Sequence, residues 1–139
     1  LANDILGDLD CRILVEPGRS LAGSAGILIS RVIYVKQGEH DRFLIIDAGM
    51  NDLLRPSLYD AYHEIVPVSQ TAGDPVRYQV VGPICETGDR LGSDRLLPPT
   101  EEGDVILIAN AGAYGRVMSS RYNLREPARE IIMPDRSRD

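Results

Sequence analysis

Short apolar runs recur along the chain and are separated by glycine, proline or acidic residues, a pattern typical of β-strands joined by turns. The run at 11–16 ends at a Pro-Gly pair and predicts a strand buried on both faces, as in a parallel sheet. Small residues at 19–26 predict a short helix, and the β-branched run at 27–36 predicts a long strand ending at Gly38. This rhythm favours a mainly β fold, a barrel or a sandwich.

The middle of the chain alternates in the same way. The segment 42–50 predicts a further strand, and a short helix is expected over 51–64, with Asn51 or Asp52 as its N-cap and a break near Pro56. The polar, proline-containing segment 89–104 is expected to be an exposed loop. The remaining strands are expected within IVPVS (65–69), VRYQVVGPIC (76–85), DVILIANAG (104–112) and AREIIM (128–133).

Composition narrows the function classes. The chain has 139 residues, about one domain, with 43% hydrophobic and 26% charged residues. Its net charge is −6 and its arginines are scattered, which argues against nucleic acid as a partner. No window approaches the roughly 20 apolar residues that a membrane helix needs, so no membrane partner is expected. We expect no metal site.

The cysteines and the N-terminus indicate context. Cys11 and Cys85 can form a disulfide in principle, but their surroundings favour reduced thiols and a cytoplasmic location. Cys11 lies in the first predicted strand and is assigned only a packing role. The segment LANDILGDLD has no initiating Met and no signal-peptide pattern, so it is interpreted as a cut chain.

Several stretches have compositions that packing alone does not require, although each has a structural alternative. EPGRS (16–20) can be a turn with a local ion pair, and the residues four apart in RPSLY (55–59) can be a solvated arginine and a core tyrosine. GAYG (112–115) can be a bulge. In GPICETGD (82–89) the cysteine can be a small buried hydrophobe, although the adjacent Glu86 would be costly to bury without a purpose.

Taken together, EPGRSLAGSAG, DAGMNDLLRPSLYDAYH, GPICETGD, GAYGRVMSSRYN and REIIM resemble, in this order, the C-terminal part of the diaminopimelate decarboxylase family. These are fold-type III enzymes that depend on pyridoxal 5'-phosphate. The resemblance runs from about residue 11 to residue 133. It implies that residues 1–26 are the last strand and loop of an N-terminal (β/α)8 barrel, and that residues 27–139 are a C-terminal Greek-key β-barrel domain like that of alanine racemase.

The resemblance also implies how the cofactor is held. Glu16 matches the carboxylate that faces the ring nitrogen of pyridoxal phosphate and keeps it protonated. Gly18 and the backbone of Arg19 match the phosphate site, and Tyr114 matches a tyrosine that closes over the phosphate and reaches the substrate.

The implied reaction is the decarboxylation of meso-2,6-diaminopimelate at its D-centre to L-lysine and CO2, the last step of lysine biosynthesis. Arg19, Arg55 and Tyr59 match residues that hold the distal carboxylate, which suits the planar guanidinium fork. Glu86 matches the partner of the distal ammonium, and Cys85 matches the proton donor to the substrate carbon. In the family this Cys-Glu pair enters the active site of the other subunit of a homodimer.

Departures from the family pattern indicate that this chain lacks residues that the reaction needs. Its one lysine, Lys36, lies in a predicted strand of the β-domain and does not match the Schiff-base lysine. His40 and His63, in surface-like contexts, do not match the histidine that stacks on the cofactor. The chain alone is therefore expected to be an inactive fragment.

Alternative functions remain open at this point. A related decarboxylase acting on ornithine, arginine or carboxynorspermidine would share EPGR and GAYG, although Glu86 and RPSLY favour a substrate with an amino-acid group at its far end. A non-catalytic homologue that binds a decarboxylase would need lost site residues, and those expected here are present. A β-domain with only a packing role leaves the clustering of motifs unexplained.

Overall fold

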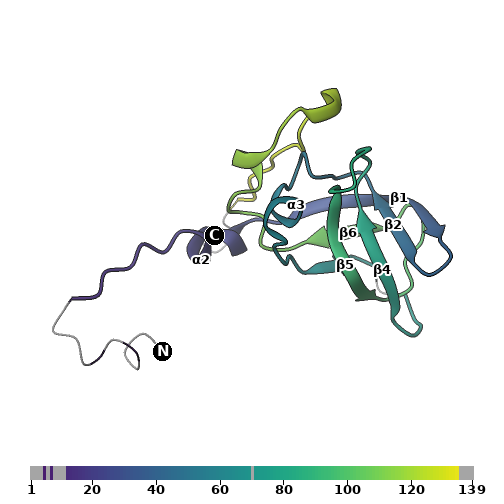
Figure 1. The fold of residues 1–139 in the computed structure, drawn as a ribbon, viewed down its shortest axis with the longest axis horizontal. Helices are drawn as coiled ribbons and strands as arrows, with labels where there is room; N and C mark the ends of the chain where they lie inside the picture. Colours follow the sequence, from purple (N-terminus) through teal and green to yellow (C-terminus); the bar gives the residue numbers. More distant parts are fainter. Residues whose placement is uncertain (1–4, 6, 8–11, 70, 135–139) are drawn as a thin grey trace.

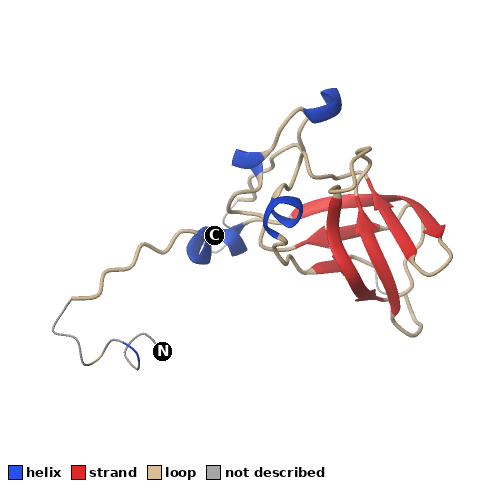
Figure 2. Ribbon diagram, viewed as in Figure 1, coloured by secondary structure: helices blue, strands red, loops and turns tan. Residues whose placement is uncertain are grey.

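The computed structural model describes residues 12–69 and 71–134 and the single positions 5 and 7, and its ribbon is dominated by one strongly curved sheet (Figures 1 and 2). The strands are β1 (Leu28–Gln37), β2 (Arg42–Ile46), β3 (Ile65–Pro67), β4 (Val76–Val81), β5 (Arg90–Leu97) and β6 (Val105–Ile108). Short helical elements accompany them: α2 (Arg19–Ala22), η1 (Gly23–Ala25), α3 (Arg55–Tyr59), η2 (Arg116–Met118) and η3 (Tyr122–Leu124).

The sheet nearly closes into a barrel. Its strand order is β3-β6-β1-β2-β4-β5, and the two outer strands, β3 and β5, are themselves in contact. The β2–β4 pair is parallel, whereas the other four pairs are antiparallel. The predicted mainly β, barrel-like fold is therefore confirmed.

The core fills the inside of this sheet with alternating strand residues. Val32, Leu44, Ile46, Val80 and the β6 pair Ile106 and Ile108 are at most 1% exposed. Tyr78, from β4, is buried with them, and its hydroxyl accepts a hydrogen bond from the Thr100 backbone N–H at 3.1 Å. Each fully buried aliphatic side chain of this kind contributes about 1.5–3 kcal/mol through the hydrophobic effect.

The strand predicted at 11–16 does not form in the part that the structure describes. Residues 12–17 have no regular structure and are exposed, with Leu14 76% and Val15 78% accessible. A strand with apolar residues on both faces needs strands on either side, and no described segment pairs with this one. Cys11, assigned a packing role, lies outside the described residues.

The helix predicted over 51–64 is shorter and begins later. It starts at Arg55 with Leu54 as its N-cap, so the prediction of Asn51 or Asp52 as the cap was wrong. Pro56 lies in the first turn, where its missing N–H costs nothing, and it does not break the helix. Asp52 instead fixes loops: its carboxylate accepts the backbone N–H groups of Gly49 at 3.0 Å and Ala128 at 2.8 Å.

Two further predictions were wrong. The expected loop 89–104 contains strand β5, whose Leu91 and Leu97 enter the core despite charged neighbours that face solvent. The expected strand at 128–133 is absent: these residues are exposed and pair with no described strand. Strand β5 lacks the regular alternation of apolar and polar residues that would have revealed it.

Candidate active site

Tyr114 is held close to Gly18 by a turn that packs on η1. The backbone N–H groups of Ala111 and Gly112 donate to the carbonyls of Gly26 at 2.8 Å and Gly23 at 3.0 Å. Tyr114 itself adopts a left-handed conformation, with φ of 59°. A Cβ atom on Gly18 would lie 3.5 Å from the Tyr114 hydroxyl oxygen, so these two motifs, far apart in sequence, meet in space.

Arg55 joins this group from the first residue of α3. Its guanidinium carbon lies 5.6 Å from the ring centroid of Tyr59 and 5.6 Å from that of Tyr114. Both distances are within the range of a cation–π interaction. The Arg55 Nε atom is buried without a hydrogen-bond partner among the described residues. The guanidinium group therefore has one N–H donor that no described residue uses, and we call Gly18, Arg55, Tyr59 and Tyr114 the arginine cluster.

Tyr114 also lines an open groove of about 720 Å³ together with residues of η1, η2 and the segment 128–133. A cavity of this size is within the range of small-molecule sites. Gly112 lies at its edge, and a Cβ atom there would be 2.2 Å from the Ala22 carbonyl oxygen. The fold thus requires glycine at position 112, where the turn that carries Tyr114 packs closely on the helical segment α2–η1.

Cys85 and Glu86 lie in a second group, on the exposed loop between β4 and β5. The Tyr122 hydroxyl donates a hydrogen bond to Glu86 Oε1, and this bond together with the Glu86 charge raises the pKa of Tyr122. The Asn123 side-chain amide lies 3.6 Å from Cys85 Sγ. We call Cys85, Glu86, Tyr122 and Asn123 the cysteine cluster.

Asp89 anchors the loop that carries the cysteine cluster. It is 3% exposed and accepts the backbone N–H groups of Met50 and Ile84, each at 2.6 Å. Burial raises the pKa of its carboxyl group, although the two N–H groups act in the opposite direction. Gly82 makes the site possible, because a Cβ atom there would lie 2.4 Å from the carboxylate.

His63, expected at the surface, is fully buried. Its Nδ1 atom lies 2.9 Å from the Ala109 carbonyl oxygen, and its Nε2 atom has no partner among the described residues. Burial lowers the pKa of His63, and the charges of Arg55, Arg19 and Arg95 add to this effect. His63 is therefore a neutral packing residue, whereas the side chain of His40 is 87% exposed, as predicted.

The structure does not bring all the expected site residues together. No hydrogen bond or ion pair among the described residues links the arginine cluster to the cysteine cluster, and Figure 1 shows η3 projecting away from α3. Glu16 lies in the exposed segment before α2, and Arg19 is exposed within α2. The expected site residues therefore lie in separate groups in the part of the chain that the structure describes.

Tyr122, Asn123 and Asp89 were not assigned roles from sequence. Tyr122 and Asn123 belong to the stretch GAYGRVMSSRYN, in which only Tyr114 was assigned a role. The sequence signal for them is only that two polar residues follow the glycine-bracketed motif in the same stretch. Asp89 follows Gly88 at the end of the Cys-Glu loop, a position typical of a turn residue. Only the fold shows that these residues hold Glu86, Cys85 and the loop.

The described residues offer neither a metal site nor a membrane-spanning helix. They contain no cluster of three or more His, Cys, Asp or Glu side chains that could hold a metal ion. None of their helices is long and apolar enough to cross a membrane.

The residues present fit a phosphorylated aldehyde cofactor. Gly18 leaves room beside the Tyr114 hydroxyl, which can donate to a phosphate oxygen.

Comparisons with known proteins agree with this arrangement. Residues 9–112 match the family described as pyridoxal-dependent decarboxylase, C-terminal sheet domain. Diaminopimelate decarboxylase of Neisseria meningitidis serogroup A is 51% identical over 129 residues, which are 93% of this chain and 32% of that protein. The enzyme of Aquifex aeolicus is 47% identical over 99% of this chain and 33% of its own length. The chain spans about a third of the relatives it matches.

Solved structures show the same fold. A crystal structure of an Aquifex aeolicus protein superimposes with a TM-score of 0.80 at 48% identity, covering 91% of this chain and 32% of that one. Diaminopimelate decarboxylase of Helicobacter pylori complexed with L-lysine gives a TM-score of 0.71 at 48% identity, covering 86% and 29%. The family match and the shared barrel together establish that the chain belongs to the pyridoxal-dependent decarboxylases and corresponds to their C-terminal sheet domain.

Proposed function

We propose that the complete protein containing this chain is a diaminopimelate decarboxylase, which converts meso-2,6-diaminopimelate to L-lysine and CO2 in the last step of lysine biosynthesis. The observation that carries the proposal is the arginine cluster, in which Arg55 lies between two tyrosine rings and keeps an unpaired buried donor. A carboxylate at the far end of the substrate is the ligand that such a guanidinium group suits best.

We assign the cofactor side of the site to residues near α2. Pyridoxal 5'-phosphate, when bound, supplies an electron sink for the bond that loses CO2. Glu16 holds the proton on the cofactor's ring nitrogen. Gly18 and the Arg19 backbone leave space for the phosphate, and the Tyr114 hydroxyl closes over it.

The far end of the substrate is held by groups from both clusters. Arg19, Arg55 and Tyr59 bind the distal carboxylate, and Tyr114 reaches the substrate as well as the phosphate. Glu86 pairs with the distal ammonium, and the Tyr122 hydroxyl bound to Glu86 Oε1 orients that carboxylate. A substrate that has both distal charges is thus distinguished from one that has a single distal charge.

Cys85 is the proposed proton donor to the carbon that loses CO2. Its thiol is exposed on the β4–β5 loop, and the Asn123 amide at 3.6 Å fixes the sulfur position. Because the two clusters lie apart within one chain, we infer that Cys85 and Glu86 enter the site of a second subunit. The protein would then be a homodimer with two shared sites.

Further proposals concern the chain as a whole. Residues 1–26 are assigned to the end of the cofactor-binding barrel, and residues 27–139 to the β-domain. The 139-residue chain alone is expected to be inactive, because its one lysine, Lys36, is exposed in β1, in the half of the strand that pairs with β2. The kinship of the β-domain with alanine racemase and a cytoplasmic location also remain predictions.

A related decarboxylase for ornithine, arginine or carboxynorspermidine is the competing proposal. The direct test is to supply the complete enzyme with pyridoxal phosphate and each of these substrates in turn, and to measure CO2 release. We expect meso-diaminopimelate to give the highest kcat/KM, with L-lysine as the product. A higher value with ornithine, arginine or carboxynorspermidine would assign the protein to that substrate instead, and no CO2 release from any of them would favour a non-catalytic homologue.

A further inference from the structure

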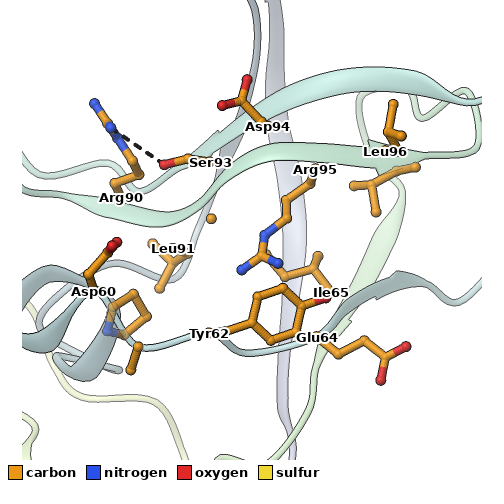
Figure 3. A pocket seen from close by; sticks show the side chains of 14 residues that line it. Asp60, Tyr62, Glu64, Ile65, Arg90, Leu91, Ser93, Asp94, Arg95 and Leu96 are labelled. Carbon is orange, nitrogen blue, oxygen red and sulfur yellow. Dashed lines mark hydrogen bonds between the residues drawn. The ribbon is translucent and has the colours of Figure 1, made fainter.

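A separate cavity of about 620 Å³ lies between α3 and strand β5 (Figure 3). It is lined by Pro56 in the first turn of α3, by Asp60 at the C-cap of that helix, by Tyr62, and by β5 residues that include Arg95. None of the residues of the arginine cluster or of the cysteine cluster lines it. Its volume is within the range of small-molecule sites.

Arg95 is one of two arginines that line this cavity, together with Arg90, and the acidic residues of the lining are Asp60, Glu64 and Asp94. Its guanidinium carbon lies 3.9 Å from the centroid of the Tyr62 ring, and Figure 3 shows it above that ring. Gly92 allows this position, since a Cβ atom there would be 2.5 Å from Arg95 Nε. The Nε atom is buried without a hydrogen-bond partner, and no described carboxylate forms an ion pair with Arg95. A guanidinium group that lies on an aromatic ring and forms no ion pair with a described carboxylate is suited to bind the carboxylate of a ligand.

The rest of the lining restricts the ligand further. Asp60 lies on the α3 side of the opening, where Figure 3 shows its carboxylate directed toward β5. The Asp94 side chain is turned away from Arg95, and its Oδ1 atom lies 3.6 Å from Arg77 Nη1. Asp94 therefore does not neutralise Arg95. Apolar residues also line the cavity: Leu96 is 63% exposed, whereas Ile65, Leu91 and Leu97 are core residues with at most 5% exposure.

We propose that this cavity binds a free α-amino acid with a linear, mainly apolar side chain. The ligand carboxylate pairs with the Arg95 guanidinium group, its ammonium group pairs with Asp60, and its side chain lies over Ile65 and Leu91. A multiply charged anion such as a phosphate is disfavoured, since Asp60 would repel it. The inference uses no residue of the proposed active site and does not depend on that proposal.

The test compares three probes that share a six-carbon chain, using the 139-residue protein. L-Norleucine has both charges, hexanoate only the carboxylate, and hexylammonium only the ammonium. We expect saturable one-to-one binding of L-norleucine in 1H–15N NMR titrations, with shifts at Tyr62 and Arg95. Hexanoate and hexylammonium should each bind about tenfold more weakly or worse, because each leaves one charged protein group unpaired. Equal binding of all three probes would overturn the proposal, as would no saturable binding of L-norleucine at millimolar concentrations.

Variants locate the site. Arg95→Gln should weaken L-norleucine binding about tenfold or more, because it removes the charge and the fork. Arg77→Gln is the matched control on the neighbouring strand β4, and Arg55→Gln is the control for binding at the arginine cluster; both should leave the affinity unchanged. Loss of binding in Arg55→Gln but not in Arg95→Gln would contradict the proposal.

Asp60→Asn provides a second test in case Arg95→Gln fails to fold, which circular dichroism would show. It should weaken L-norleucine binding and leave hexanoate binding unchanged or stronger, because only the ammonium partner is lost. If Asp60→Asn affects neither probe, Asp60 is not part of the site and the amino-acid assignment is wrong.

Discussion

At the residue scale, the proposed site depends on charged groups that have no internal partner or only a neutral one. Arg55 lies between two rings, and Glu86 accepts a bond from the neutral Tyr122 hydroxyl. In the complete enzyme, Arg55→Ala and Glu86→Ala should each reduce kcat/KM for meso-diaminopimelate by the equivalent of about 2–5 kcal/mol, the usual effect of leaving a desolvated charge unpaired. Cofactor affinity, measured by absorbance titration, should change much less.

Arg77→Ala is the matched control for these two variants, because Arg77 is an exposed arginine of the same domain. It should leave both kcat/KM and cofactor affinity unchanged. If Arg55→Ala or Glu86→Ala weakened the cofactor as much as the substrate, its assignment to the distal end of the substrate would be wrong.

His63 gives a residue-scale prediction for stability. Because burial lowers its pKa in the folded state, its contribution to stability is complete above the ordinary value of 6.5 and is lost as the pH falls below that value. The wild-type free energy of unfolding should therefore fall between pH 7 and pH 5, with a slope of up to about 1.4 kcal/mol per pH unit from this group. Urea denaturation at several pH values measures it.

His63→Asn keeps a donor for the Ala109 carbonyl and should remove this part of the pH dependence. His40→Asn is the control, since the side chain of His40 is 87% exposed and the substitution should leave the slope unchanged. An identical slope in the wild type and in His63→Asn would show that His63 does not titrate differently in the folded state.

At the element scale, the closest contact in the candidate site is between η1 and the turn that carries Tyr114. Gly112→Ala would place a Cβ atom 2.2 Å from the Ala22 carbonyl oxygen and 2.6 Å from the Gly26 nitrogen. Both are backbone atoms, so the elements must separate, which typically costs about 1–3 kcal/mol. Thermal unfolding should show the loss, whereas Gly88→Ala, with no atom within 4 Å of the added Cβ, should be nearly neutral. Equal stability of the two variants would mean that this contact is loose.

How far the elements could be predicted depended on their periodicity. Strands β1, β2 and β6 follow β-branched apolar runs and were predicted, as was the helix made of small residues at 19–22. Strand β5 was missed because its sequence, RLGSDRLL, mixes charged residues with glycine, and only Leu91, Gly92 and Leu97 face inward. The segment at 128–133 has strand composition but no partner strand. Pairing is a property of the whole sheet, which local sequence does not show.

Residues of the candidate site could be predicted when they belonged to a sequence motif. Residues that contact the site only in the folded chain could not. Arg55, Tyr59 and Tyr114 were selected as motif members, and the fold places them together. Tyr122 contacts Glu86, which lies 36 residues away in the sequence, and Asp89 contacts Met50, which lies 39 residues away. No local pattern therefore indicated these contacts. The role of each selected residue in catalysis stays a prediction.

At the scale of the whole molecule, the two clusters explain why one chain would not make a complete site. The cysteine cluster is exposed on the loop and on η3, away from the arginine cluster. An exposed thiol beside a carboxylate gains a function if a second subunit brings its own arginine cluster against it. The central claim is therefore that each active site is composed of both clusters, one from each subunit.

Mixing two inactive variants of the complete enzyme tests this claim most directly. One variant carries Cys85→Ala and the other lacks its cofactor-binding lysine, and the two are combined under conditions in which subunits exchange. Random pairing makes about half of the dimers mixed, each with one intact shared site, so CO2 release from meso-diaminopimelate should recover to about a quarter of the wild-type rate. Recovery near this level is the predicted result. No recovery, despite subunit exchange shown by mass spectrometry, would contradict the claim that Cys85 acts in the partner's site.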